Sequence, residues 1–272
     1  MSSFAKILAV VLLASNVGNA QGLRVSQFIY DASRLDESGN EPLLSSSFTL
    51  FHNGRVYDYV EAAGEVVRFE PVAKRFTVIN PRRGVYTTVP FDEVTSILKA
   101  RGPESQTYIK ELLSQKSPQA ERAARMLNFQ LNPKFDSKYT ERTGMLQLSA
   151  PSWKYFVTTR EWDDTEQLQQ YLTYTDWMAR LNCVLHPHSM FPEPRLALND
   201  QLRELKNRIP VYVQLDLRPD ERMILRAEHK FVRNLTDHDR TLINDWDNAL
   251  KSAELRNVPL RKYQEAVLVS GN

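Results

Sequence analysis

The clearest pattern in the chain is an alternation of apolar and polar positions in two short segments, residues 47–52 and 55–60. The dipeptide Asn53–Gly54 separates them, and it is typical of a type I′ hairpin because both central residues of that turn need a positive φ. A two-residue loop places Leu50 opposite Tyr57 and Phe48 opposite Tyr59. The pattern therefore predicts a hairpin with an apolar, aromatic-rich face.

Strand-like segments continue after this hairpin and return near the C-terminal end of the chain. The turn Pro81–Gly84, the glycine Gly144 and the segment 218–220 separate neighbouring segments. Short apolar runs bounded by such residues predict antiparallel strands. The predicted strands are 65–70, 74–80 and 85–89, several within 135–161, and the pair 211–217 and 223–231.

Other segments have apolar residues at helical spacing. They predict helices at 91–98, 103–113, 118–127, 163–181, 196–207 and 239–253. Pro103 is expected to begin a new helix, Ser117 to cap the next one, and Asp163 with Glu166 to form a capping box. Residues 186–194 contain three prolines and are expected to form an irregular loop, and residues 255–272 a weakly structured tail or a final edge strand.

No Gly/Ser-rich linker and no internal repeat divides the chain. We therefore expect residues 21–272 to form a single α+β domain, with a curved antiparallel β-sheet (an incomplete barrel) and helices packed on one face. The amphipathic helices between 91 and 127 are expected to cover the apolar face of the first meander.

The first twenty residues have the pattern of a cleavable signal peptide. Lys6 supplies a positive charge, residues 7–14 form an apolar run too short to span a bilayer, and small residues at Gly18 and Ala20 fit a cleavage site. Cleavage after Ala20 predicts export to the periplasm or the extracellular space. No later stretch has transmembrane length, so no integral membrane span is expected.

Composition limits the classes of partner. The formal net charge is +2, and it becomes +1 when Lys6 is removed, so we expect no nucleic-acid or anionic-membrane surface. Cys183 is the only cysteine, so no intramolecular disulfide can form. Its apolar neighbours favour a buried, inert thiol over a reactive one.

The sequence contains no local catalytic or cofactor-binding signature. A nucleophile elbow, a phosphate-binding loop, a helical zinc motif and a dinucleotide fingerprint are all absent. We therefore assign no catalytic residue and no cofactor, and we favour a non-enzymatic role.

Histidines offer the few candidate chemical groups. His186 and His188 form an H-x-H pair that could ligate a metal, although Pro187 between them favours an ordinary polar loop. Strand alternation places His229 on a buried face, where a core histidine with one hydrogen bond is the favoured interpretation and a proton carrier the alternative. His238 is expected to lie near the N-terminal cap of the last helix, which Thr236 or Asp237 would provide.

Two polar features have both a structural and a functional interpretation. The acids Glu161, Asp163 and Asp164 could be taken for a catalytic carboxylate pair, but acids at a helix start already have a capping role. Asn234 begins a glycosylation sequon with Thr236, which is meaningful only in a eukaryotic host.

Aromatic residues are the positive evidence for function. The chain has 11 Tyr, 12 Phe and 4 Trp, mostly on predicted strands. They either fill the core of a large sheet, which we favour, or line a cavity for an apolar ligand such as an acyl chain. Together with export and the absence of disulfides, a meander with the aromatic-rich strand end Arg68–Pro71 resembles the periplasmic lipoprotein-carrier superfold, across residues 43–130. That resemblance implies an incomplete barrel closing over helices around a lipid site, and it assigns no functional residue.

Three functions remain open from the sequence. The first is an exported protein that binds or carries an apolar, lipid-like small molecule. The second is a structural or interaction protein of the cell envelope with a fully packed core. The third is a hydrolase that uses His186, His188 or His229 together with distant acids.

Overall fold

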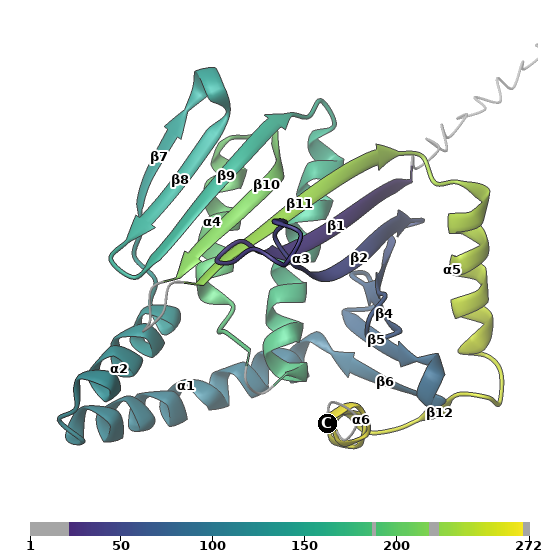
Figure 1. Cartoon of the computed structure of the whole chain (residues 1–272). Helices are drawn as coiled ribbons and strands as arrows, with labels where there is room; N and C mark the ends of the chain where they lie inside the picture. The colour runs from purple at the N-terminus through teal and green to yellow at the C-terminus, as the bar shows by residue number, and fades with distance from the viewer. Residues whose placement is uncertain (1–21, 187–188, 218–222, 269–272) are drawn as a thin grey trace, which may run out of the picture.

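The computed structural model describes residues 22–186, 189–217 and 223–268. The expected signal peptide, the second histidine of the H-x-H pair (His188) and the turn at 218–220 lie outside these residues. Within them, the chain forms one open, 12-stranded sheet with helices on both of its faces (Figure 1).

The sheet is antiparallel except at one edge. Its strand order is β12-β6-β5-β4-β3-β2-β1-β11-β10-β9-β8-β7, and only the β12–β6 pair is parallel. The predicted α+β class and antiparallel sheet are confirmed. The strands are β1 (Leu23–Asp31), β2 (Leu43–His52), β3 (Arg55–Val60), β4 (Glu65–Glu70), β5 (Arg75–Asn80), β6 (Val85–Pro90), β7 (Asp136–Thr140), β8 (Met145–Ala150), β9 (Trp153–Glu161), β10 (Arg208–Leu217), β11 (Met223–Arg233) and β12 (Arg256–Asn257).

The hairpin β2–β3 has the predicted register. Leu50 pairs with Tyr57 and Phe48 with Tyr59. Asn53 and Gly54 have φ values of 49° and 72°, as the type I′ turn requires.

Strand β1 was not anticipated, and it determines the topology of the sheet. It pairs with β2 on one side and with β11 on the other, so it joins the N-terminal meander to the C-terminal strands. Its sequence, LRVSQFIYD, has a weaker alternation than its neighbours. The pairing of residues about 200 positions apart in the sequence depends on tertiary contacts rather than on local pattern.

The helices are α1 (Phe91–Ser114), α2 (Pro118–Leu131), α3 (Thr165–Leu185), α4 (Glu193–Glu204), α5 (Asp237–Ala249) and α6 (Leu260–Leu268). Neighbouring residues of a strand face opposite sides of a sheet, and both sides are buried here. Phe51 belongs to the main apolar core with α3, whereas Leu50 belongs to a second core with α5. The sequence had indicated helices on one face; α5 adds a layer on the other (Figure 1).

Trp246 of α5 is the centre of the second core. Its ring lies 6.3 Å from the Phe48 ring, 6.1 Å from Tyr57 and 5.9 Å from Tyr59, each in a stacked arrangement. The predicted aromatic wall of the β2–β3 hairpin is therefore covered by α5. Thr236 caps this helix and forms a capping box with Asp239, so one of the two predicted capping residues is confirmed.

Charged side chains also connect α5 to the sheet. The Asp247 carboxylate accepts hydrogen bonds from the Tyr57 hydroxyl at 3.1 Å and from Arg68 at 2.9 Å, and Arg68 pairs with Glu70 at 3.0 Å. Burial raises the pKa of Glu70, but the hydrogen bond from Arg75 and the nearby arginine charges outweigh it and leave that pKa below its usual value. The group acts as a connected network in which one arginine bridges two carboxylates.

Three predicted helix boundaries were wrong. Pro103 lies inside α1 instead of starting a new helix; proline removes one backbone donor, and packing against α3 and α2 holds the two halves of α1 together. The cap of α3 is Asp164, which accepts from the Gln167 amide at 2.8 Å, rather than Asp163. Helix α4 begins at Glu193, within the segment expected to be a loop, because a proline is tolerated in a first helical turn.

The position of the first two helices and the C-terminal tail also differ from expectation. Only the start of α1 packs on the meander, through Phe91 against Phe69 and Phe76. The α1–α2 hairpin then extends away from it, so α3 covers most of this face of the meander (Figure 1). The tail contains a two-residue edge strand, β12, in keeping with the expected edge segment, and then helix α6, which was not predicted. Tyr263 anchors α6 by donating a hydrogen bond to the buried carboxylate of Glu65 at 2.6 Å.

Candidate functional site

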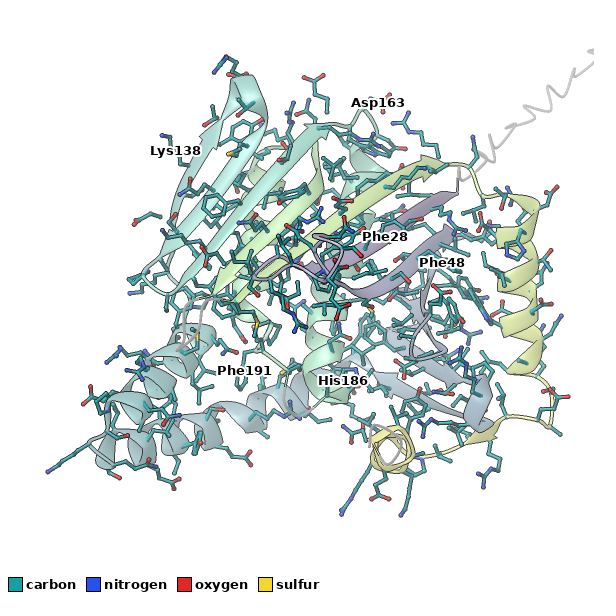
Figure 2. All side chains as sticks on the ribbon, viewed as in Figure 1. Phe28, Phe48, Lys138, Asp163, His186 and Phe191 are labelled. Atoms are coloured by element: carbon teal, nitrogen blue, oxygen red, sulfur yellow. The ribbon has the colours of Figure 1, made fainter. Side chains whose placement is uncertain are left out.

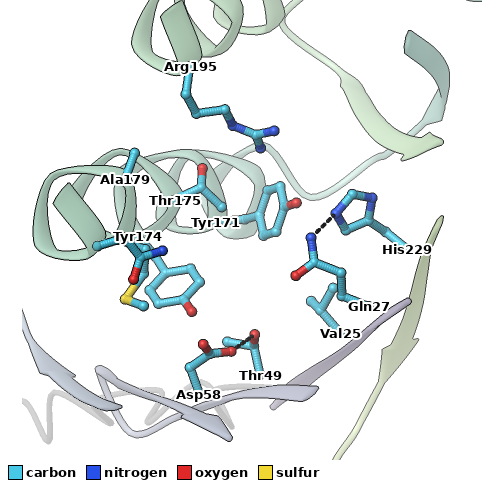
Figure 3. Close-up of a pocket in the computed structure, with 12 residues that line it drawn as sticks. Val25, Gln27, Thr49, Asp58, Tyr171, Tyr174, Thr175, Ala179, Arg195 and His229 are labelled. Carbon is cyan, nitrogen blue, oxygen red and sulfur yellow. Dashed lines mark hydrogen bonds between the residues drawn. The ribbon is translucent and has the colours of Figure 1, made fainter. Parts of the chain in front are cut away.

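A polar cavity of about 240 Å³ lies between the sheet and α3 (Figure 3). We call it the Asp58–Arg195 cavity, after the two charged residues on its walls. The sheet contributes Val25 and Gln27 from β1, Thr49 from β2, Asp58 from β3 and His229 from β11. The helical wall comprises Tyr171, Tyr174, Thr175, Met178, Ala179 and Asn182 of α3, and Arg195 of α4.

Local periodicity explains how each wall forms. Tyr171, Tyr174 and Met178 are spaced by three and four residues, so they lie on one face of α3. Alternate positions of the strands face the same side, which sets Asp58 beside Val56 of the main core. Asn182 is exposed, so the cavity reaches the surface near the C-terminal end of α3.

Asp58 is a buried carboxylate in a hydrogen-bonded cluster. It accepts from the Thr49 hydroxyl at 2.6 Å and from the Tyr174 hydroxyl. Burial raises the pKa of Asp58 to about 6, and the two hydrogen bonds only partly oppose this rise. A carboxyl with such a pKa changes its charge near neutral pH.

His229 lies on the opposite part of the sheet wall and is kept neutral. Burial, together with the positive charge of Arg195, lowers its pKa to about 3. Its Nε2 atom lies 3.1 Å from the Gln27 amide nitrogen. An amide nitrogen only donates, so Nε2 accepts and the ring proton resides on Nδ1. This Nδ1 atom is buried and has no hydrogen-bond partner within the described residues.

Arg195 reaches the cavity from α4 and contacts the Tyr171 hydroxyl (Figure 3). Within the described part of the chain, no carboxylate forms an ion pair with its guanidinium. The pKa of Asp58 responds to the charge of Glu65, not to that of Arg195, so the two named charges of the cavity do not neutralise each other directly. The cavity thus has a cationic end and an acidic end.

A second hollow, which we call the α3 groove, lies at the other end of the same helix and has a volume of about 410 Å³. Its floor is apolar and comes from Phe51, Val56 and Phe69, and its rim includes Pro71 and the polar residues of the first turns of α3. The Phe51 ring, 5.6 Å from Tyr174 and 6.4 Å from Tyr171, lies between this groove and the Asp58–Arg195 cavity.

Only the first histidine of the candidate metal pair lies within the described residues. His186 is exposed at the C-terminal end of α3, opposite the end where Asp163 lies (Figure 2), and His188 lies outside the described residues. Among residues 22–186, 189–217 and 223–268, no group of three or more His, Cys, Asp or Glu side chains is arranged to hold a metal ion. The described contacts of His229 include no hydroxyl or thiol, so it does not form a nucleophile–base pair with one.

The remaining sequence candidates have structural contacts. Cys183 is buried, and burial raises the pKa of its thiol. Asp164 caps α3, Asp163 pairs with Arg233, and Glu161 pairs with Arg208 at 3.4 Å. These acids are directed to separate partners, and only Asp164 has the capping role that the sequence had assigned to Asp163.

Asn234 and His238 are exposed near the start of α5. Neither belongs to the cavity or the groove. The aromatic residues mainly pack against one another, as in the cluster of Phe69, Phe76, Phe91 and Trp177, where the last two rings stack at 3.8 Å. This agrees with the favoured interpretation that they fill the core.

Sequence reasoning identified His229 but not the other polar residues of the cavity. Asp58 was missed because it lies opposite the predicted aromatic face of its strand, where alternation alone predicts a solvent-facing position. Arg195 and Tyr171 left no signal, since nothing local distinguishes them from surface residues of amphipathic helices.

Neither a known protein-family model nor a curated protein sequence matches this chain. None of the helices in the described ranges combines the length and the apolar character that a membrane-crossing segment needs. The Asp58–Arg195 cavity and the α3 groove are therefore the features of the molecule that bear on its function.

Proposed function

We propose that this protein is exported and binds an apolar, lipid-like ligand between the sheet and α3, with the apolar part of the ligand in the α3 groove. The observation that carries the proposal is the apolar floor of this groove, formed by Phe51, Val56 and Phe69 under a polar rim. Its volume of about 410 Å³ falls in the range of small-molecule sites.

The contrast between floor and rim favours an amphipathic ligand over a wholly apolar one. Gln169, Gln170 and Thr173 at the rim offer hydrogen-bonding groups to a polar head, while the aromatic floor offers an apolar surface to a chain. The exposed Val72 extends this apolar surface to the edge of the groove. The signal-peptide pattern of residues 1–20 and the resemblance to lipoprotein carriers support the same proposal from the sequence.

Burial of apolar area predicts how affinity should depend on the ligand. Each methylene removed from water contributes about 0.8 kcal/mol, which corresponds to roughly four-fold in the dissociation constant. In a series of saturated fatty acids, affinity should rise by about this factor per added carbon until the groove is full, and then level off. Titration with a fluorescent fatty acid and competition by the series would measure it.

A variant at the rim separates the groove from non-specific adsorption. Thr173 is exposed and lines the groove, so Thr173→Trp should fill it without disturbing the core and should weaken binding at least ten-fold. Thr107→Trp, the same change at an exposed position of α1, is the matched control and should leave binding unchanged. Equal binding by both variants, together with a lipid-free mass spectrum of protein purified without detergent, would overturn the proposal.

A further inference from the structure

We propose that the Asp58–Arg195 cavity is a second binding site, separate from the α3 groove, for a small carboxylic acid that carries a hydrogen-bond donor at its other end. This inference does not depend on lipid binding in the groove. It rests on the arrangement of donors and acceptors around the cavity of about 240 Å³.

The cationic end of the cavity supplies donors without a matching acceptor. Arg195 presents its guanidinium toward the cavity and has no carboxylate partner among the described residues (Figure 3). A guanidinium matches a carboxylate geometrically and always remains charged. A carboxylate ligand is therefore the natural complement of this unpaired guanidinium.

His229 contributes a neutral imidazole to the same cavity wall. Its Nε2 accepts from Gln27 and its Nδ1 is buried, so the ring brings no positive charge to the cavity. Arg195 is therefore the cation at this end, and it selects a negatively charged acceptor and disfavours a cation.

The acidic end has the opposite preference. The Asp58 carboxylate lies in the same cavity, with Thr49 and Tyr174 donating to it. A carboxylate accepts several hydrogen bonds, so a hydroxyl or ammonium group of a ligand can join this cluster. Tyr171 feels the charges of both Arg195 and Asp58, which places it between the two ends. The opening beside Asn182 leads from the surface to this space.

The test uses the full mature chain and three families of probe: acetate, butyrate and hexanoate, their terminal hydroxy derivatives, and their terminal amino derivatives. Isothermal titration at neutral pH should show binding in the order amino, hydroxy, then plain acid for the chain length that spans the cavity. The methyl esters, which lack the negative charge, should not bind. Laurate tests whether the carboxylate that this cavity binds belongs to a lipid. Displacement of a bound amino acid probe by laurate would show that the natural ligand is a lipid head group instead of a free small acid.

Three variants test which residue of the cavity binds each end of the ligand. Arg195→Gln should weaken binding of every acid at least ten-fold, because a charge-assisted hydrogen bond is lost, while Arg195→Lys should retain part of the affinity. Arg180→Gln removes a neighbouring positive charge that does not line the cavity, and it is the matched control. Asp58→Asn should abolish the advantage of the amino derivative while keeping affinity for the plain acid.

Several results would overturn the inference. These are the absence of binding of any probe to the wild type at millimolar concentration, equal binding of acids and methyl esters, or equal effects of Arg195→Gln and Arg180→Gln. The ester comparison uses only the wild type, so it decides the question even if a variant fails to fold. Loss of fatty-acid binding by Thr173→Trp with retained binding of small acids would show that the two sites are independent.

Discussion

Gln27 and His229 are direct cross-strand partners in the β1–β11 pair, and the Gln27 amide donates to His229 Nε2 at 3.1 Å. This contact joins a strand near the N-terminus to one near the C-terminus. It also fixes the ring as the Nδ1–H tautomer, with Nε2 as the acceptor.

The first prediction concerns acid destabilisation by His229. Its folded-state pKa of about 3 lies below the usual 6.5, because burial and the charge of Arg195 disfavour its protonation. The unfolded chain therefore binds the extra proton, so the contribution of His229 to the free energy of unfolding should fall as the pH drops below about 6.5, by about 1.4 kcal/mol per pH unit. His229→Gln, which cannot be protonated, should remove this loss in urea titrations. His238→Gln, at an exposed site, controls for the loss of a histidine as such; an unchanged slope in the His229 variant would contradict the prediction.

The second prediction concerns Asp58, whose pKa is shifted upward, whereas the pKa of His229 is shifted downward. Its folded-state pKa of about 6 lies above the usual 3.8, so the folded chain binds the proton more tightly and stability is lost as the pH rises through this window. Between about pH 4 and 6 the Asp58 and His229 effects offset each other in the wild type. Asp58→Asn should therefore lose stability more steeply on acidification than the wild type, whereas His229→Gln should gain it. Urea titrations of both variants in the same buffers would measure the change in the free energy of unfolding with pH. Changes of the same sign in the two variants, each relative to the wild type, would contradict this interpretation.

The third prediction concerns the attachment of α5. Trp246 stacks on three rings of the sheet and is nearly fully buried. Trp246→Ala should reduce the free energy of unfolding by about 3–5 kcal/mol, as for other large-to-small core changes. Amide exchange should accelerate most in α5. Asn244→Ala, at an exposed position of the same helix, should have little effect, and a similar effect of both changes would argue against a role for the stacked rings.

The fourth prediction concerns α6. The Tyr263 hydroxyl donates to the buried Glu65 carboxylate at 2.6 Å, and this bond opposes the rise that burial causes in the pKa of Glu65. Tyr263→Phe leaves that carboxylate without its partner and should cost about 1–3 kcal/mol. In the Tyr263→Phe variant, the free energy of opening of α6 should be lower at neutral pH than at pH 4, where Glu65 is more readily protonated. Hydrogen exchange, corrected for the intrinsic exchange rate at each pH, would measure it. Tyr108→Phe, at a residue that is 53% exposed, is the matched control; equal stability of both variants would show that α6 is held by other contacts.

Much of the local structure could be predicted because its causes are local. The register of β2–β3 follows from a two-residue turn with positive φ at Asn53 and Gly54, and the cap of α5 from the hydroxyl of Thr236 three residues before Asp239. Errors arose where distant packing overrides local preference. Pro103 stays within α1 because its flanks pack on α3 and α2, and β1 pairs with two strands despite its weak alternation.

The candidate sites needed the tertiary structure. The sequence by itself determined that His229 lies on a buried strand face, but it gave no reason to expect Asp58 to be buried, because Asp58 lies opposite the predicted aromatic face of its strand. It could not place Arg195 and Tyr171 against them, because these residues come from helices far along the chain and meet the strands only when α3 and α4 cover the sheet. Periodicity specifies which side of an element is buried, whereas the partner across the interface is decided by how whole elements pack.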